Sequence, residues 1–134
     1  IPVIYYGDEY GMPGANDPDN RRMMRFSGLN KREENVKATV MKLSSIRRSH
    51  MALLFGDVRL LLSDNNVFAY LRYYFDDIVL VVFNKGNESE SITISKDDLM
   101  MEDYNLNFGS SIQVDSDDLT ITLEPYSFDI ITNR

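Results

Sequence analysis

The sequence predicts a mainly β protein in which an antiparallel sandwich or barrel follows a short strand–loop–helix segment. Three observations support this fold class. After Gly56, short runs of residues alternate between apolar and polar side chains with the period of two that strands require. Turn-forming residues separate these runs at intervals of about 8–12 residues, as in sandwiches and barrels. Before Gly56, a single stretch has apolar residues at helical spacing.

Residues 1–6 predict a strand that is buried on both faces, because β-branched and aromatic side chains occupy both alternating sets of positions. Residues 11–28 are rich in Gly, Pro, Asn and Asp, which predicts an irregular loop. Loops of this length tend to carry function. A strand with no partner strand in the chain, and a chain that starts at Ile1 without a signal pattern, together indicate a segment of a larger domain.

Residues 31–49 predict a helix. Asn30 is a suitable N-cap, and Glu33 stands three residues later, where it completes a capping box. Arg47 and Arg48 fall in the last turn, where positive charge suits the helix dipole. One face of the helix carries an apolar stripe formed by Val36, Val40, Leu43 and Ile46.

The remaining chain predicts seven strands separated by turns. The run 78–83 is apolar throughout, which predicts a central strand. In the run 119–123 the apolar residues alternate with Thr120 and Thr122, which predicts one face in the core and one in solvent. The predicted strands are 58–62, 67–74, 78–84, 91–94, 111–114, 119–123 and 127–132.

Composition excludes several classes of protein. The 134 residues carry a formal charge of −7, whereas a nucleic-acid binder needs clustered Lys and Arg. No run approaches the roughly 20 apolar residues of a membrane span. With no cysteine, the chain cannot form disulfides or a thiolate metal site. The charge is +3 up to Leu62 and −10 from Ser63 onward, and the acidic residues fall mostly at predicted turns, which favours a solvated rim over a binding tail.

Few residues point to chemistry. No nucleophile motif and no metal site are predicted, and the lone His50 favours a packing or capping role at a helix end. Asp17 and Arg21 could pair and together offer acceptors and a planar donor fork, which suits sugar hydroxyls, although spacing alone favours a surface salt bridge. An aromatic set could stack on sugars, but core packing explains it better. The set comprises Phe68, Tyr70, Tyr73, Tyr74 and Phe75.

Several motifs resemble the α-amylase family, glycoside hydrolase family thirteen. Residues 1–9, Ile-Pro-Val-Ile-Tyr-Tyr-Gly-Asp-Glu, are similar to the last barrel strand of that family. Residues 11–22, ending in Asp-Pro-Asp-Asn-Arg-Arg, resemble the neopullulanase, cyclomaltodextrinase and maltogenic amylase branch. Residues 43–57 are similar to the final barrel helix and its exit, and 123–127, Leu-Glu-Pro-Tyr-Ser, to the closing strand of domain C.

This resemblance implies that residues 1–55 are the last strand, substrate loop and last helix of a truncated (β/α)₈ barrel. Residues 56–134 would then be the antiparallel Greek-key β-sandwich called domain C. The resemblance also implies a retaining α-glucan hydrolase whose catalytic carboxylates all precede Ile1. We therefore expect this chain to have no catalytic residue and no activity alone. Asp17 and Arg21 match residues that line the substrate cleft of the branch.

The implied partners are an α-glucan or maltooligosaccharide and the remainder of the catalytic barrel, with no metal or other cofactor. An independent carbohydrate-binding or interaction module of β-sandwich type remains the alternative function, and it requires exposed aromatic side chains on one sheet face. A third possibility is a self-associating domain, because a strand–helix unit without partners would leave apolar surface exposed.

Overall fold

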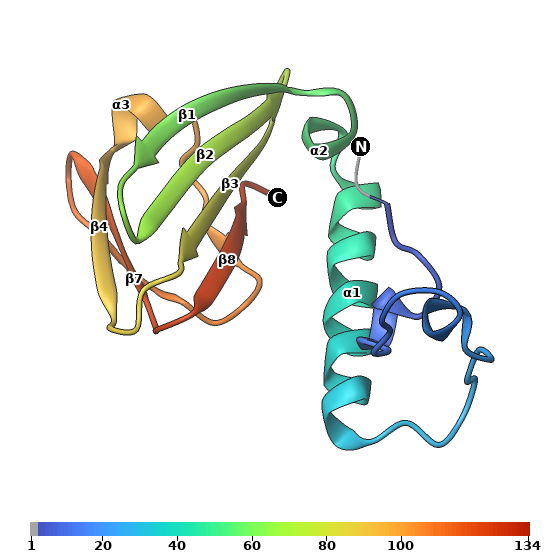
Figure 1. Cartoon of the computed structure of the whole chain (residues 1–134). Coiled ribbons are helices and arrows are strands. Elements are labelled where there is room, and N and C mark those ends of the chain that lie inside the picture. Colours follow the sequence, from blue (N-terminus) through green and yellow to red (C-terminus); the bar gives the residue numbers. More distant parts are fainter. Residues whose placement is uncertain (1–2) are drawn as a thin grey trace. The chain divides into compact units, whose positions relative to one another are not determined.

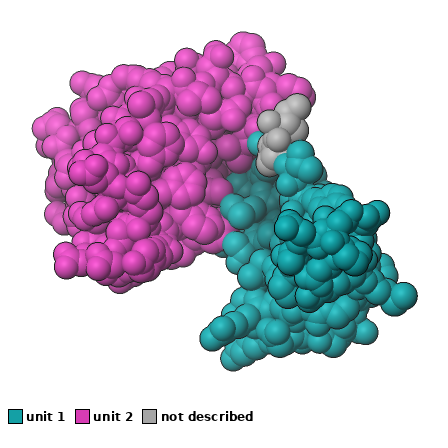
Figure 2. Space-filling model, viewed as in Figure 1, with its two compact units in different colours: residues 1–49 teal, residues 50–134 magenta. Residues whose placement is uncertain are grey.

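The computed structural model describes residues 3–134, which divide into two compact units. Figure 2 colours them separately: one unit runs from residue 1 to 49, the other from 50 to 134. Compact units and family domains are different divisions of a chain, so the predicted domain boundary between residues 55 and 56 stays a prediction. None of the helices in residues 3–134 is both long and apolar enough to cross a membrane.

The second unit contains two antiparallel sheets that form a β-sandwich, as the sequence predicts (Figure 1). All seven predicted strands are present. The larger sheet has the order β1-β2-β3-β8-β5, with β1 Asp57–Ser63, β2 Val67–Tyr74, β3 Asp77–Asn84, β8 Ser127–Thr132 and β5 Asn105–Leu106. The smaller sheet has the order β4-β7-β6, with β4 Glu90–Ser95, β7 Asp118–Leu123 and β6 Ser111–Val114.

The core lies between the inner faces of the two sheets. Strand β3 pairs with both β2 and β8 and is buried along nearly its whole length, which confirms the predicted central strand. In β7 the hydroxyls of Thr120 and Thr122 face outward and lie 3.1 Å and 2.9 Å from those of Thr93 and Ser91 on β4. The innermost side chains of the core include Leu71, Leu80, Leu99, Leu119, Ile121, Leu123 and Ile131.

Two short helices complete the regular structure of the second unit. Helix α2, Met51–Phe55, packs against β2 and β3. Helix α3, Lys96–Leu99, follows β4. The sequence did not predict α2, α3 or β5, because each is too short to show a period of its own.

The first unit consists of helix α1, Lys31–Ser49, and an irregular loop with two 3₁₀ turns, η1 Asp8–Tyr10 and η2 Asp19–Arg21. The helix bounds and the capping box are as predicted. The Asn30 side chain accepts from the amides of Arg32 and Glu33 at 2.9 Å and 3.1 Å, and the Glu33 carboxylate accepts from the Asn30 amide at 2.8 Å. Of the predicted apolar stripe, only Ile46 is buried.

The predicted strand at residues 1–6 is wrong for residues 3–6, and residues 1–2 lie outside the described residues. Val3 to Tyr6 form no strand, and their side chains are 43–80% exposed. The composition of residues 3–6 is typical of a doubly buried strand, but a strand also needs neighbours for its backbone amides and carbonyls. No strand pairs with residues 3–6 in the described chain.

A buried carboxylate fixes the segment that follows β5. Asp129 on β8 is fully buried, and its Oδ1 accepts from the amides of Asn107 and Phe108 at 2.9 Å and 2.8 Å. Its Oδ2 accepts from the Ser110 amide at 2.9 Å and the Ser110 hydroxyl at 2.7 Å. Burial acts to raise the pKa of Asp129, but these hydrogen bonds outweigh it and hold the pKa below the ordinary 3.8.

Replacing Asp129 by Ala should lower the free energy of unfolding at pH 7 by about 3 kcal/mol, because these four donors and the Ile130 amide lose a charged acceptor. The native pKa lies below the unfolded one, so this contribution is fully present above the unfolded pKa and is lost as pH falls toward the native pKa. Urea unfolding of the unchanged protein and of Asp129→Ala should therefore show a difference in the free energy of unfolding that becomes smaller below pH 4. Asp97→Ala, an exposed carboxylate, serves as the control. An equal loss for Asp97→Ala, or a gap that is constant with pH, would contradict this role.

Candidate functional site

The loop of the first unit is held at both ends by one buried side chain. Tyr10, only 2% exposed, places its hydroxyl 3.2 Å from Met12 Sδ and 3.4 Å from Met24 Sδ. The same hydroxyl accepts from the Arg25 amide at 3.4 Å, and the Arg25 guanidinium lies 5.6 Å from the centre of the Tyr10 ring. These contacts bring the start and the end of the loop together, so the segment between them projects as a closed loop.

Two carboxylate–guanidinium pairs form within this loop. Arg21 Nε lies 2.9 Å from Asp17 Oδ1, and a second contact joins Arg21 to Asp17 Oδ2. Arg22 pairs with Asp19 in the same two-point way, at 2.5 Å and 2.8 Å. The structure thus brings together the two residues that the sequence singles out, and it adds a neighbouring pair of the same chemistry.

The two pairs differ in what else they hold. Asp19 Oδ2 also accepts from the Ala15 amide at 3.0 Å, so the Asp19–Arg22 pair ties the loop to its own backbone. The Arg22 hydrogen bond lowers the pKa of Asp19. Among residues 3–134, the side chains of Asp17 and Arg21 form ion-pair hydrogen bonds only with each other, and they are 61% and 66% exposed. Their remaining acceptor and donor positions are therefore open to a hydroxyl-bearing ligand.

A cleft of about 240 Å³ lies beside these pairs. Tyr5, Tyr6, Asp8, Asp19 and Asn20 contribute to its lining, whereas Asp17 and Arg21 do not. Asp8 Oδ2 accepts from the Tyr5 amide at 2.9 Å, so this carboxylate also fixes the local backbone. Gly7 has a φ of 95°, and a Cβ at this position would lie 2.7 Å from Met12 Cβ, so glycine is required for the loop to close here.

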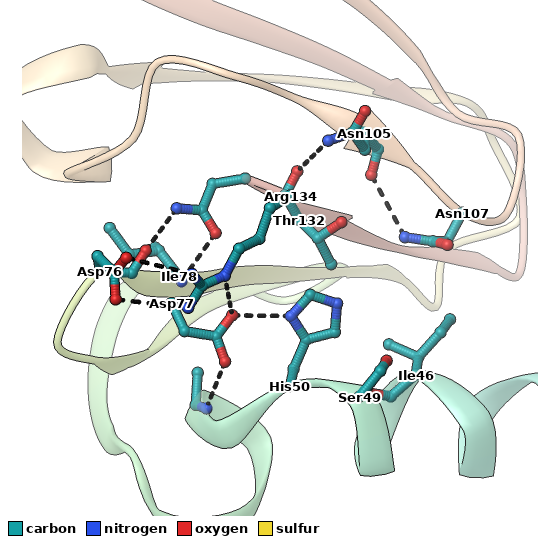
Figure 3. Close-up of polar contacts among 12 residues, drawn as sticks. Ile46, Ser49, His50, Asp76, Asp77, Ile78, Asn105, Asn107, Thr132 and Arg134 are labelled. Atoms are coloured by element: carbon teal, nitrogen blue, oxygen red, sulfur yellow. Dashed lines mark hydrogen bonds and ion pairs between the residues drawn. The ribbon is translucent and has the colours of Figure 1, made fainter.

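His50 has the structural role that the sequence favours (Figure 3). It is buried, and its Nδ1 lies 2.8 Å from Asp77 Oδ1. Asp77 Oδ2 accepts from the Ala52 amide at 2.9 Å, and Arg134 Nε lies 3.6 Å from Asp77 Oδ1. Burial acts to raise the pKa of Asp77, but the His50 and Ala52 hydrogen bonds, with the nearby Arg134 charge, lower it. Asp77 thus joins α2 to the β2–β3 turn.

The predicted aromatic set does not form one platform. Tyr73 packs against the core, and Tyr74 and Phe75 meet edge to face at 4.8 Å where β2 turns into β3. Phe68 and Tyr70 lie on the outer face of the larger sheet, with ring centres 5.6 Å apart. The sequence analysis does not single out Phe83, whose ring stacks near Tyr70 at 6.5 Å, because the run 78–83 is apolar throughout and predicts a central strand. Because side chains alternate along a strand, Phe83 falls on the opposite face from Leu80 and Val82, and this alternation could have predicted its outward position.

Within residues 3–134, no three His, Cys, Asp or Glu side chains gather in a way that could hold a metal ion. The polar groups of the loop can offer hydrogen bonds and charge to a ligand.

Comparison with known proteins supplies a family for this arrangement. Residues 58–130 match the family described as "Maltogenic Amylase, C-terminal domain". The chain is 33% identical over 129 residues to a cyclomaltodextrinase of Geobacillus thermopakistaniensis, a match that covers 95% of this chain and 22% of that protein.

Two solved structures share the fold along almost the whole chain. An Anoxybacillus α-amylase superposes with a TM-score of 0.83 at 26% identity, covering 98% of this chain and 28% of the other. The α-amylase of Geobacillus thermoleovorans, solved in complex with acarbose, gives 0.81 at 25% identity and covers 100% and 30%. The chain therefore spans less than a third of the length of each of these three proteins.

Removing the Asp17–Arg21 pair should leave stability unchanged. Because both side chains are mostly exposed, Asp17→Ala and Arg21→Ala should each alter the free energy of unfolding by less than about 1 kcal/mol. Urea unfolding followed by circular dichroism measures this, with Tyr10→Ala as a destabilised reference. A loss comparable to that of Tyr10→Ala would mean that the pair holds the loop together.

Proposed function

Because this chain belongs to the α-amylase family, glycoside hydrolase family thirteen, and contains its maltogenic amylase C-terminal domain, we propose that it is the C-terminal part of a retaining α-glucan hydrolase. In this proposal the sandwich stabilises a catalytic barrel and the loop of residues 11–28 adds substrate contacts. The three matched proteins, all much longer than this chain, are named for activity on α-glucans.

The apolar face of α1 is the observation that carries this proposal. The helix has an amphipathic stripe, yet Ile46 is its one buried residue. In this stripe Val36 is 40% exposed, and Val40 and Leu43 are only half-buried. Met41, on another face of the helix, is 63% exposed, and Val3 and Ile4 are similarly open. A soluble helix normally gains its stability by burying such a stripe against neighbouring elements. The barrel that precedes this segment in family members would supply those neighbours.

The sandwich has its own uncovered apolar side chains close to α2. Leu54, Phe55, Val58 and Leu60 are 36–67% exposed on α2 and on β1, an edge strand. A cluster of this kind marks a contact surface. We assign it to packing against the barrel, with residues 1–55 as the last barrel loop and helix and residues 56–134 as domain C. The connections from β3 to β4 and from β7 to β8 cross between the sheets and support the proposed Greek-key arrangement.

Asp17 and Arg21 are the proposed substrate contacts. They form an exposed, two-point ion pair whose free lone pairs and N–H groups suit the hydroxyls of an α-glucan or maltooligosaccharide. The pair stands on a loop closed by Tyr10, so its position is fixed before a ligand arrives. The catalytic carboxylates would come from the barrel, and the chain alone would be inactive.

The purified chain should release no reducing sugar from maltodextrin or pullulan. The same chain, expressed together with the barrel encoded upstream of Ile1, should release it. In that longer protein, Arg21→Ala should raise KM or lower kcat/KM about tenfold, because one charged hydrogen-bonding group to the glucan is lost.

Arg22→Ala is the matched control. Arg22 makes the same kind of pair in the same loop, but its partner is Asp19, whose carboxylate also accepts from the loop backbone. Its kcat/KM should stay within about twofold of the unchanged protein. Hydrolysis by the chain alone, or an upstream sequence without a barrel, would overturn the proposed function. Equal effects of Arg21→Ala and Arg22→Ala would overturn the role of Asp17 and Arg21.

A further inference from the structure

A second cleft, of about 410 Å³, lies on the sandwich where the β1–β2 turn meets the end of β3. This volume falls in the range of roughly 300–1,000 Å³ typical of small-molecule sites. Phe68 and Phe83 line it and are 41% and 38% exposed. They are register partners on β2 and β3, so both rings stand on the outer face of the sheet. The cleft is at the opposite end of these strands from α2, which packs near Tyr73 and Asp77.

The two rings are held in place by further aromatic side chains. Tyr70 lies 5.6 Å from Phe68 and 6.5 Å from Phe83, and in the second contact the rings are inclined by only 23°. Phe128 on β8 lies 6.0 Å from Phe83 and 4.6 Å from Phe108. Rings packed in this way lose little further freedom when a ligand covers them, so they form a rigid apolar platform.

Polar groups of both signs border the platform. Asp64, Asn66 and Lys85 line the same cleft, and the charges of Asp64 and Lys85 cancel. Within the described chain, neither the side-chain amide of Asn66 nor the ammonium group of Lys85 forms a hydrogen bond or ion pair. An acceptor, an amide and a cationic donor around apolar rings suit a neutral polyhydroxyl ligand, whereas an anion would meet Asp64 and an apolar ligand would leave these groups unpaired.

The backbone that carries these groups is fixed by a buried asparagine. Asn84 is 2% exposed; its Nδ2 donates to the carbonyls of Glu88 and Glu124 at 2.8 Å and 3.0 Å, and its Oδ1 accepts from the Gly86 amide at 2.8 Å. The Lys85 amide donates to the Asn66 carbonyl at 2.9 Å, which ties the two turns together. The cleft is therefore formed before any ligand binds.

We infer that this cleft is a second carbohydrate site, made by residues other than those of the Asp17–Arg21 loop, that binds the α-glucan chain. The apolar face of a glucosyl ring would lie on Phe68 and Phe83, and its hydroxyls would meet Asp64, Asn66 and Lys85. This inference rests on the proposed function for the identity of the ligand. Such a site would hold a polymeric substrate on the protein without taking part in hydrolysis.

Native electrophoresis of the 134-residue chain in gels with and without amylopectin tests the inference, and calorimetric titration with maltoheptaose gives the affinity. The chain should be retarded by amylopectin. Phe83→Ala and Phe68→Ala should each weaken binding at least about fivefold, because each removes one stacking surface. Asn66→Ala and Lys85→Ala alter exposed side chains only, so a loss of binding in these variants cannot come from unfolding.

Phe75→Ala is the matched control, because Phe75 is an even more exposed ring at the other end of the same hairpin. It should bind like the unchanged chain. No retardation of the unchanged chain, or an equal loss in Phe75→Ala, would overturn the cleft assignment. These results would leave the proposed function standing, because that depends on hydrolysis by the longer protein.

Discussion

The apolar layer between the two sheets is the constraint on which the rest of this chain depends. Strands β2, β3, β7 and β8 each place every second residue in that layer, and Leu71, Leu80, Leu119 and Ile131 are completely buried there. A slip of one residue in any pairing would turn such side chains outward, so the layer fixes the register of both sheets. The register in turn fixes which side chains reach the outer face, including Phe68 and Phe83, and therefore where a ligand surface can form.

Buried polar side chains secure the segments that this layer cannot hold. Asp77 accepts from α2, Asn84 bonds to the segments around β4 and β7, and Asp129 accepts from the chain after β5. Each satisfies several groups at once, which is what makes burial of a carboxylate or amide tolerable. The sandwich thus has a complete interior. By contrast, α1 buries little more than Ile46, and its loop depends on Tyr10. The first unit therefore leaves most of the apolar side chains of α1 uncovered or only partly covered.

Local patterns were enough to predict most elements and the Asp17–Arg21 pair, but not the Phe68–Phe83 cleft. The capping box at Asn30 predicts the start of α1, and apolar patterns and turn signals predict seven of the eight strands of the sandwich. The failure at residues 3–6 arose because side-chain composition cannot supply a pairing partner. The Asp17–Arg21 pair could be predicted because its two members lie only four positions apart in the sequence. The Phe68–Phe83 cleft was not, since it depends on a cross-strand register that joins distant residues.

In the proposed function the sandwich has its own interior, whereas the first unit gains cover from a barrel. Amide hydrogen exchange on the 134-residue chain tests this difference, because it measures the stability of each segment separately. We expect amides of residues 36–45 in α1 to exchange faster than those of Val79 to Val82 in β3 by more than about two orders of magnitude. Equal protection in α1 and β3 would contradict it, because the helix would then be stable without any further cover.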